Sequence, residues 1–281
     1  MAVKVVTDSS SRLCADELQR WDIRQVPLHI LVDGRDLRDG VDQIPADVHE
    51  RQRVTTAGAT PAELAETYRR ALQESGGAGV VAVHISGALS STLTAAEQAA
   101  REFGGSVRVV DSKSAAMGTG FVALAAARAA LAGQDVASVD AAAVSAVRRS
   151  RAFIVVQRLD NLRRSGRVSK GAAWLSTALA IKPLLRVDDN GKLVLAQRVR
   201  TPTKALAVMV DQAAEFVGDR PAAIAVHHVV NASAASDVAA ALSARLPHVT
   251  ELTISGMGPV LAVHVGTGAV GVVVSLTGSV Q

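Results

Sequence analysis

Short apolar runs alternate with helical patterns through the first half of the chain, and each run ends in a polar turn. Four runs have the length of buried strands: Val3 to Val6, Val26 to Val32, Val80 to Ile85 and Val107 to Val110. The second of them ends at the Asp33-Gly34 turn. Because strands that alternate with helices favour right-handed crossovers, we expect an α/β domain with a mainly parallel sheet.

Helix starts are marked most clearly at Thr60, which is followed by Pro61 and Glu63. Threonine as the N-cap, proline at the first helical position and glutamate at the third form a capping box. Two alanine-rich segments, Gly118 to Leu131 and Val139 to Arg149, are predicted as further helices.

The second half of the chain has a different pattern. Leu184 to Val187 and Lys192 to Ala196 flank Asp189-Asn190-Gly191, a strong hairpin signal because Asn-Gly tolerates positive φ. A hairpin within helix–strand alternation predicts a mixed sheet. Before it lie a basic segment that ends at Lys170 and a nearly uncharged run from Trp174 to Leu185. The change of pattern predicts two α/β domains, residues 1–158 and 159–281.

Composition excludes several classes of protein. The 281 residues are 49% hydrophobic but only 2% aromatic, and the net charge is +4. Basic runs occur near Arg149 and Arg164 without aromatic side chains for base stacking, which tells against binding of single-stranded nucleic acid. A nucleic-acid-binding regulator would show affinity that falls steeply with salt, and we expect no nucleic-acid partner. The single cysteine, Cys14, excludes an intramolecular disulfide and a thiolate metal cluster. With no secretion signal and no run able to span a bilayer, we expect a cytoplasmic protein.

Hydroxyl side chains gather in the loops that follow the predicted strands. Ser9, Thr56, Ser90 and Ser112 each lie in such a loop. In open α/β sheets these loops meet at one edge, where ligands bind, so these hydroxyls could converge. Hydroxyls and backbone N–H groups at a helix start suit an anion such as a phosphate or carboxylate. The alternative is that the hydroxyls only cap the helices.

Motifs for metal, phosphate or covalent chemistry are absent from the sequence. The histidines lack zinc-ligand spacing, and no Walker loop, GxGxxG turn or nucleophile elbow is found. His264 is distinctive because it follows a glycine-rich turn within an apolar stretch. Apolar surroundings favour the neutral imidazole, which can donate one hydrogen bond or accept a proton. A core histidine bonded to a backbone carbonyl is the alternative.

Several motifs in order along the chain are similar to those of the DegV family. They are TDSSS, Thr55-Thr56, ISGALSST, VVDS, Asn161-Leu162 with Ser165-Gly166-Arg167, Lys182-Pro183, and Gly258-Pro259 with His264. The resemblance implies two α/β domains that enclose a long-chain fatty acid such as palmitate between them. It also implies that the chain is a carrier without catalytic residues or a cofactor. A separate ATP-dependent fatty acid kinase subunit would convert the presented carboxylate to an acyl phosphate.

The resemblance also implies roles for individual residues. Thr56 and Ser90, with Thr55 and Ser91 beside them, match the hydroxyls that hold the carboxylate, and His264 matches a histidine near it. Arg167 and Arg200 match basic positions for the head group or for the kinase.

This sequence departs from the usual family pattern in three short stretches, Ala57-Gly58-Ala59, Ser90-Ser91-Thr92 and Gly266-Thr267-Gly268. The hydroxyls remain in place. A second interpretation is a subunit of a small-molecule kinase that resembles dihydroxyacetone kinases, with a histidine as the substrate anchor.

Overall fold

The computed structural model describes residues 2–51, 53–168 and 182–278. Contacts between residues divide the chain into two compact units. The first unit consists of residues 1–44 and 55–149, and the second of residues 45–54 and 150–281. Lys170 and the greater part of the uncharged run that begins at Trp174 lie outside the described residues.

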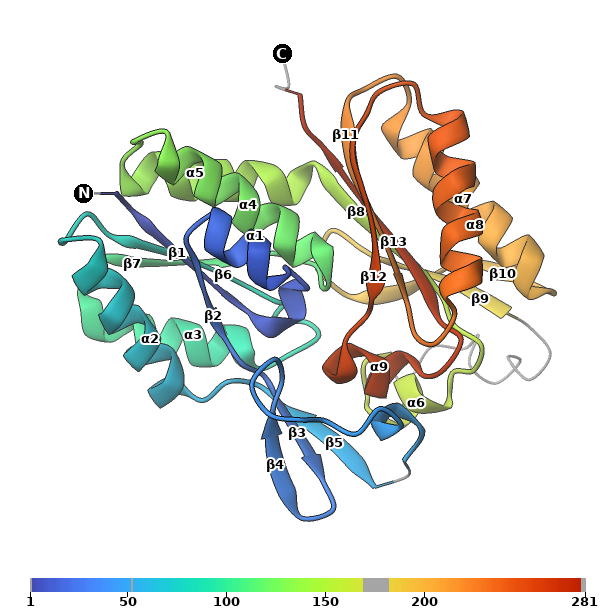
Figure 1. Cartoon of the computed structure of the whole chain (residues 1–281), viewed down its shortest axis with the longest axis horizontal. Coiled ribbons are helices and arrows are strands. Elements are labelled where there is room, and N and C mark those ends of the chain that lie inside the picture. The colour runs from blue at the N-terminus through green and yellow to red at the C-terminus, as the bar shows by residue number, and fades with distance from the viewer. Residues whose placement is uncertain (1, 52, 169–181, 279–281) are drawn as a thin grey trace. The chain divides into compact units, whose positions relative to one another are not determined.

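The first unit is built on a parallel four-stranded sheet. Its strand order is β2 (Ile23–Val26), β1 (Lys4–Asp8), β6 (Val80–His84) and β7 (Val107–Asp111). The helices α2 (Pro61–Glu74) and α3 (Thr92–Ala100) cover one face, and α4 (Met117–Leu131) and α5 (Val136–Arg148) cover the other (Figure 1). A short helix α1 (Ala15–Arg20) contacts β2. The predicted parallel sheet is confirmed.

Both faces of this sheet are covered by helices, and the apolar side chains of its strands suit that environment. Every side chain of β6 is buried, as expected for a strand that packs against helices on both sides. The predicted capping box at the start of α2 is present, with the Thr60 and Glu63 side chains each bonded to the other's backbone N–H.

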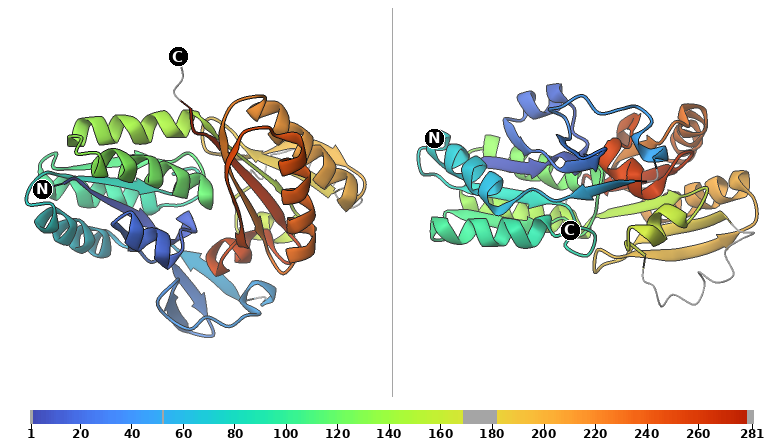
Figure 2. Two further views of the ribbon diagram at one scale, coloured as in Figure 1. Left: turned by 45° about the horizontal axis from the view of Figure 1, so that its top comes forward. Right: turned by 90° about the horizontal axis from the view of Figure 1, so that it is seen from below.

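A smaller three-stranded sheet stands beside the parallel sheet. Its order is β4 (Arg35–Arg38), β3 (His29–Val32) and β5 (Val54–Ala57), and β3 and β4 form an antiparallel hairpin (Figure 2). The prediction of one strand from Val26 to Val32 is wrong. Pro27 has no N–H for a ladder, and the Leu28 N–H donates to Ser9 Oγ, so the chain leaves the parallel sheet there. The turn between β3 and β4 has positive φ at Asp33 and Gly34.

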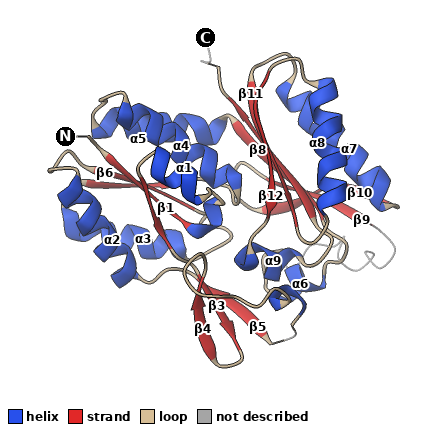
Figure 3. Cartoon of the chain, in the orientation of Figure 1, coloured by secondary structure: helices blue, strands red, loops and turns tan. Residues whose placement is uncertain are grey.

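The second unit is built on a mixed six-stranded sheet. Its order is β10 (Leu193–Val199), β9 (Lys182–Val187), β8 (Ser150–Val155), β13 (Val270–Leu276), β11 (Ala222–His228) and β12 (Val249–Gly256). Only β11 and β12 are parallel neighbours among these described strands. The helices α7 (Pro202–Val217) and α8 (Ala232–Arg245) pack against the sheet and each other (Figure 3). The predicted hairpin and mixed sheet are both confirmed.

Two short helices follow strands at one end of this sheet. They are α6 (Asp160–Arg164), which comes after β8, and α9 (Pro259–Val265), which comes after β12. The single-turn helix η2 (Val48–Glu50) contacts α9.

The division of the chain into two units differs from the predicted boundary after residue 158. β8 pairs with β9 and β13, which places it in the second unit, and residues 45–54 join that unit through α9.

Candidate functional site

Three buried polar side chains link the ends of β1 and β6 in the first unit. Asp8 and His84 are the last residues of these neighbouring strands, and Asp8 Oδ2 accepts a hydrogen bond from His84 Nδ1 at 3.0 Å. On the other side of the ring, His84 Nε2 lies 2.7 Å from the Tyr68 hydroxyl oxygen. All three side chains are fully buried. Burial, and secondarily the charge of Asp8, raises the pKa of Tyr68 far above its usual range.

Asp8 is held by more than the histidine. Its carboxylate also accepts hydrogen bonds from the Ile85 N–H at 2.9 Å, the Ser10 N–H at 3.0 Å and the Ser10 hydroxyl. A buried carboxylate requires such compensation, because an unpaired buried charge is costly. The Asp8–His84–Tyr68 chain therefore fixes how the loops after β1 and β6 leave the sheet. Sequence reasoning missed this chain. Part of the signal was present, since Asp8 lies two residues after the predicted strand Val3 to Val6 and His84 lies near the end of the predicted strand Val80 to Ile85, but only the structure pairs these strands.

The loop after β6 brings Ser90 to the start of α3. Ser90 Oγ lies 2.8 Å from Thr92 Oγ1 and accepts the Thr92 N–H at 3.2 Å. Ser90 is half-buried, whereas Ser91 is exposed. The N-terminal end of a helix carries a partial positive charge and N–H groups that point outward, which favours a negatively charged group there.

The loop after β5 lies directly against this helix start. A Cβ atom on Gly58 would lie only 2.5 Å from Thr92 Oγ1 and 3.1 Å from the Thr92 nitrogen. Glycine is therefore needed for the close approach of the two loops. Thr56 is half-buried two residues before Gly58, and Thr55 is exposed. The structure thus brings the Thr56 loop and the Ser90 loop together, although Thr56 arrives from the three-stranded sheet and its segment is a strand as far as Ala57.

The other two hydroxyls expected at this edge already have hydrogen-bond partners, Ser9 in the segment after β2 and Ser112 close to its own loop. Ser9 is buried, accepts the Leu28 N–H at 3.0 Å and bonds to Asp39. Ser112 is buried, donates to the Ser114 carbonyl oxygen at 3.2 Å and lies 2.9 Å from Thr119 Oγ1. Both hydroxyls stabilise loops.

In the second unit, the imidazole of His264 and the guanidinium of Arg167 are close enough to interact electrostatically. His264 lies on α9, and Arg167 follows α6, which contacts α9. Burial, together with the positive charge of Arg167, lowers the pKa of His264 to about 4. Burial likewise lowers the pKa of Arg167. The prediction of a neutral imidazole at this position agrees with these shifts.

Arg200 lies at the end of the sheet from which α6 and α9 start. It follows Val199, which pairs with Lys182 in β9, and Lys182 Nζ donates to the Gln157 carbonyl oxygen just after β8 at 3.0 Å. Its side chain is exposed. The turn after α9 is held at the same end, where a Cβ on Gly268 would lie 2.7 Å from Gln157 Cγ.

Metal-ligand clusters of three or more His, Cys, Asp or Glu side chains are not found in the part of the chain that the structure describes. Within the same residues, the helices are too short or too polar to cross a bilayer.

Comparison with known proteins places the chain in a family. The family model described as "Uncharacterised protein, DegV family" matches residues 2–277. A DegV domain-containing protein of Mycobacterium tuberculosis is 64% identical over 279 residues, which cover 99% of each chain. A DegV domain-containing protein of Streptomyces coelicolor is 41% identical over 277 residues, covering 97% of this chain and 98% of its relative. The chain belongs to the DegV family.

Solved structures of the family share the fold across the whole chain. A DegV family protein from Thermus thermophilus, whose structure is described as one of fatty acid binding, is 31% identical with a TM-score of 0.92. The match covers 99% of this chain and 100% of that one. DegV of Bacillus subtilis, described as a fatty acid binding protein, is 27% identical with a TM-score of 0.88, over 99% and 100% of the two chains.

Proposed function

We propose that this protein binds a long-chain fatty acid and presents its carboxylate to a separate ATP-dependent kinase for conversion to an acyl phosphate. The observation that carries the proposal is the contact between Gly58 and Thr92, which joins the Thr56 loop to the Ser90 loop at the start of α3. Family membership and the fatty acid binding described for the Thermus thermophilus and Bacillus subtilis proteins support the same ligand.

In this proposal, the hydroxyls of Thr56 and Ser90 donate hydrogen bonds to the carboxylate, and the N-terminal end of α3 favours its negative charge. Burial of about ten methylene groups contributes about 8 kcal/mol at roughly 0.8 kcal/mol each. A hydrogen bond to a charged group contributes about 1.5–3 kcal/mol. The acyl chain therefore supplies most of the affinity, and the hydroxyls prevent the larger cost of an unpaired carboxylate.

His264, Arg167 and Arg200 retain the roles that the family resemblance implies. A neutral imidazole at His264 can donate one hydrogen bond to an oxygen atom without adding charge. The exposed guanidinium of Arg200 suits an acidic surface on a protein partner.

Native mass spectrometry of the purified protein tests the ligand. We expect a bound species with the mass of a long-chain fatty acid, and the protein stays soluble without it after delipidation. Palmitate then raises the Tm, whereas dihydroxyacetone, the ligand expected for a small-molecule kinase subunit, leaves it unchanged. A protein that carries no lipid and responds only to the ketone contradicts the proposal.

The double variant Thr56→Ala with Ser90→Ala tests the carboxylate site. Palmitate binding is expected to weaken while the Tm changes little, because both side chains are in loops or at a strand end. Thr55→Ala with Ser91→Ala, the other two hydroxyls that the resemblance names, is expected to weaken palmitate binding less, since these side chains are exposed. Equal palmitate affinity in the first double variant and the wild type would place the carboxylate elsewhere.

A further inference from the structure

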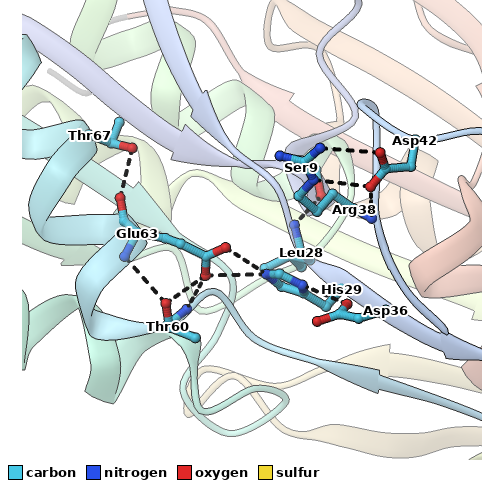
Figure 4. Close-up of polar contacts among 9 residues, drawn as sticks. All are labelled: Ser9, Leu28, His29, Asp36, Arg38, Asp42, Thr60, Glu63 and Thr67. Carbon is cyan, nitrogen blue, oxygen red and sulfur yellow. Dashed lines mark hydrogen bonds and ion pairs between the residues drawn. The ribbon is translucent and has the colours of Figure 1, made fainter. Parts of the chain in front are cut away.

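His29 on the central strand of the three-stranded sheet lies between two carboxylates. Its Nδ1 is 2.8 Å from Asp36 Oδ1 on β4, and its Nε2 is 3.1 Å from Glu63 Oε1 on α2 (Figure 4). The His29 side chain is only 9% exposed, whereas those of Asp36 and Glu63 are 56% and 34% exposed. The imidazole thus connects the β3–β4 hairpin to the first turn of α2.

The two contacts require a particular protonation state. A carboxylate only accepts hydrogen bonds, and a neutral imidazole donates from one nitrogen while the other carries a lone pair. Both ring nitrogens of His29 therefore donate only when the ring is an imidazolium. Loss of the proton turns one lone pair toward a carboxylate, which replaces an attraction with a repulsion.

Glu63 also forms hydrogen bonds with Thr60, in the loop before α2. Its Oε2 accepts the Thr60 N–H at 2.8 Å and the Thr60 hydroxyl at 2.7 Å, and the Glu63 N–H donates to Thr60 Oγ1 at 3.3 Å. Burial acts to raise the pKa of Glu63, but the hydrogen bonds from Thr60 and the charge of His29 outweigh it and lower that pKa overall.

These contacts close a ring around the loop of residues 57–60. β3 carries His29 and pairs with β5, which carries Thr56. The loop leads from β5 into α2, where Glu63 forms an ion pair with His29. On the other side, Gly58 in this loop contacts Thr92. The loop is therefore held at both sides, by His29 through Glu63 and by the start of α3.

The other charged groups of this region are two arginines and Asp42, and Asp42 is already paired. Arg38 pairs with Asp42, donating from its backbone N–H at 2.8 Å and from Nε at 3.0 Å (Figure 4). The side-chain hydrogen bond to Asp42 and the charge of Asp42 raise the pKa of Arg38, with smaller contributions from Glu63 and Asp36. Arg35 adds positive charge near Asp42.

We propose that His29, as an imidazolium, is a positioning residue. Its two ion pairs, with Asp36 and Glu63, form a clasp that joins the β3–β4 hairpin to α2 and so holds the Thr56 loop in its carboxylate-binding position. Deprotonation of His29 loosens the clasp, which makes fatty acid retention sensitive to pH. This regulatory role rests on the proposed function, whereas the clasp itself can be observed without a ligand.

The experiment compares the delipidated wild-type chain with His29→Gln and Asp42→Asn between pH 5 and pH 8.5. Glutamine keeps one donor but cannot carry a proton to a second carboxylate. Asp42→Asn is the matched control, because it breaks an exposed ion pair beside the same hairpin and leaves His29 in place. The readouts are hydrogen-exchange protection of residues 57–60, the ¹⁵N shifts of the His29 ring and palmitate affinity.

In the wild type and Asp42→Asn, the ring shifts are expected to report an imidazolium at low pH. Protection of residues 57–60 and palmitate affinity are then expected to fall about threefold to tenfold as the ring loses its proton, as for loss of one partly exposed charge-assisted hydrogen bond. In His29→Gln both changes disappear. The fatty acid's own ionisation affects all three proteins equally.

Identical pH profiles in the wild type and His29→Gln, or a neutral His29 ring at pH 5, would overturn the inference while palmitate binding stands. Protection that depends on His29 in a protein that never binds palmitate would support the clasp and refute the proposed function instead.

Discussion

Gly58 gives the sharpest test of the contact between the two hydroxyl-bearing loops. In Gly58→Ala, the new Cβ would lie 2.5 Å from Thr92 Oγ1, 3.1 Å from the Thr92 nitrogen and 3.3 Å from its Cα. The backbone of Gly58 is outside the left-handed region, so alanine itself is not strained there. The effect of the substitution therefore comes from the contact alone.

The size of the effect follows from what can move. The Thr92 side chain can rotate away only by losing its 2.8 Å contact with Ser90, and the Thr92 backbone is fixed within α3. The Gly58 loop must then shift, and overpacking of this kind costs about 1–3 kcal/mol. Since Thr56 lies in the segment that shifts, we expect palmitate affinity to fall about tenfold, equivalent to ~1.4 kcal/mol.

The assay is displacement of a fluorescent fatty acid by palmitate from the delipidated full-length protein, with the Tm measured in parallel. Gly256→Ala is the matched control, because Gly256 has no atom within 4 Å of its Cβ position and no positive φ. Adding Thr92→Ala to Gly58→Ala removes the shortest contact and should recover part of the affinity. A stable Gly58→Ala protein with wild-type palmitate affinity would refute the reasoning that these loops form one carboxylate site.

Three further predictions concern single side chains. The pKa of His264 is lowered from 6.5 to about 4, so the unfolded state binds more protons between these values and stability falls as the pH drops through them. Urea unfolding at pH 4.5 to 7 should show this slope reduced in His264→Gln, and an unchanged slope would contradict the assignment. Tyr68→Phe leaves the buried His84 Nε2 without this partner and should lower the free energy of unfolding, measured with urea, by about 1–3 kcal/mol. If the proposed kinase partner is correct, Arg167→Ala should reduce acyl phosphate formation with that kinase more than palmitate binding, and equal losses would place Arg167 at the ligand.

Local signals explain why much of the fold was predictable. The capping box at Thr60 and Glu63 and the turn at Asn190-Gly191 each depend on side chains a few residues apart. Such patterns depend little on the rest of the protein. The buried strand Val80 to His84 was equally clear, because a strand covered on both faces needs an unbroken apolar run.

The single strand predicted from Val26 to Val32 shows where local signals fail. The segment is apolar apart from His29, but Pro27 interrupts the ladder and the Leu28 N–H finds its partner in Ser9, far away in the sequence. The resulting hairpin places His29 between Asp36 and Glu63, a contact that sequence spacing does not suggest.

By itself, the sequence determined the two α/β domains, the family and the hydroxyl-bearing segments. Strand runs, helix caps and motifs depend on residues that are close together in the sequence, so they can be recognised without the fold. Only the tertiary structure decided which hydroxyls meet. Gly58 and Thr92 come into contact because β5 belongs to a separate sheet, whereas Ser9 bonds to Leu28 and Asp39 and Ser112 bonds within its own loop. Likewise, Asp8 and His84 pair because their strands are neighbours in the sheet. Packing between distant segments sets these contacts.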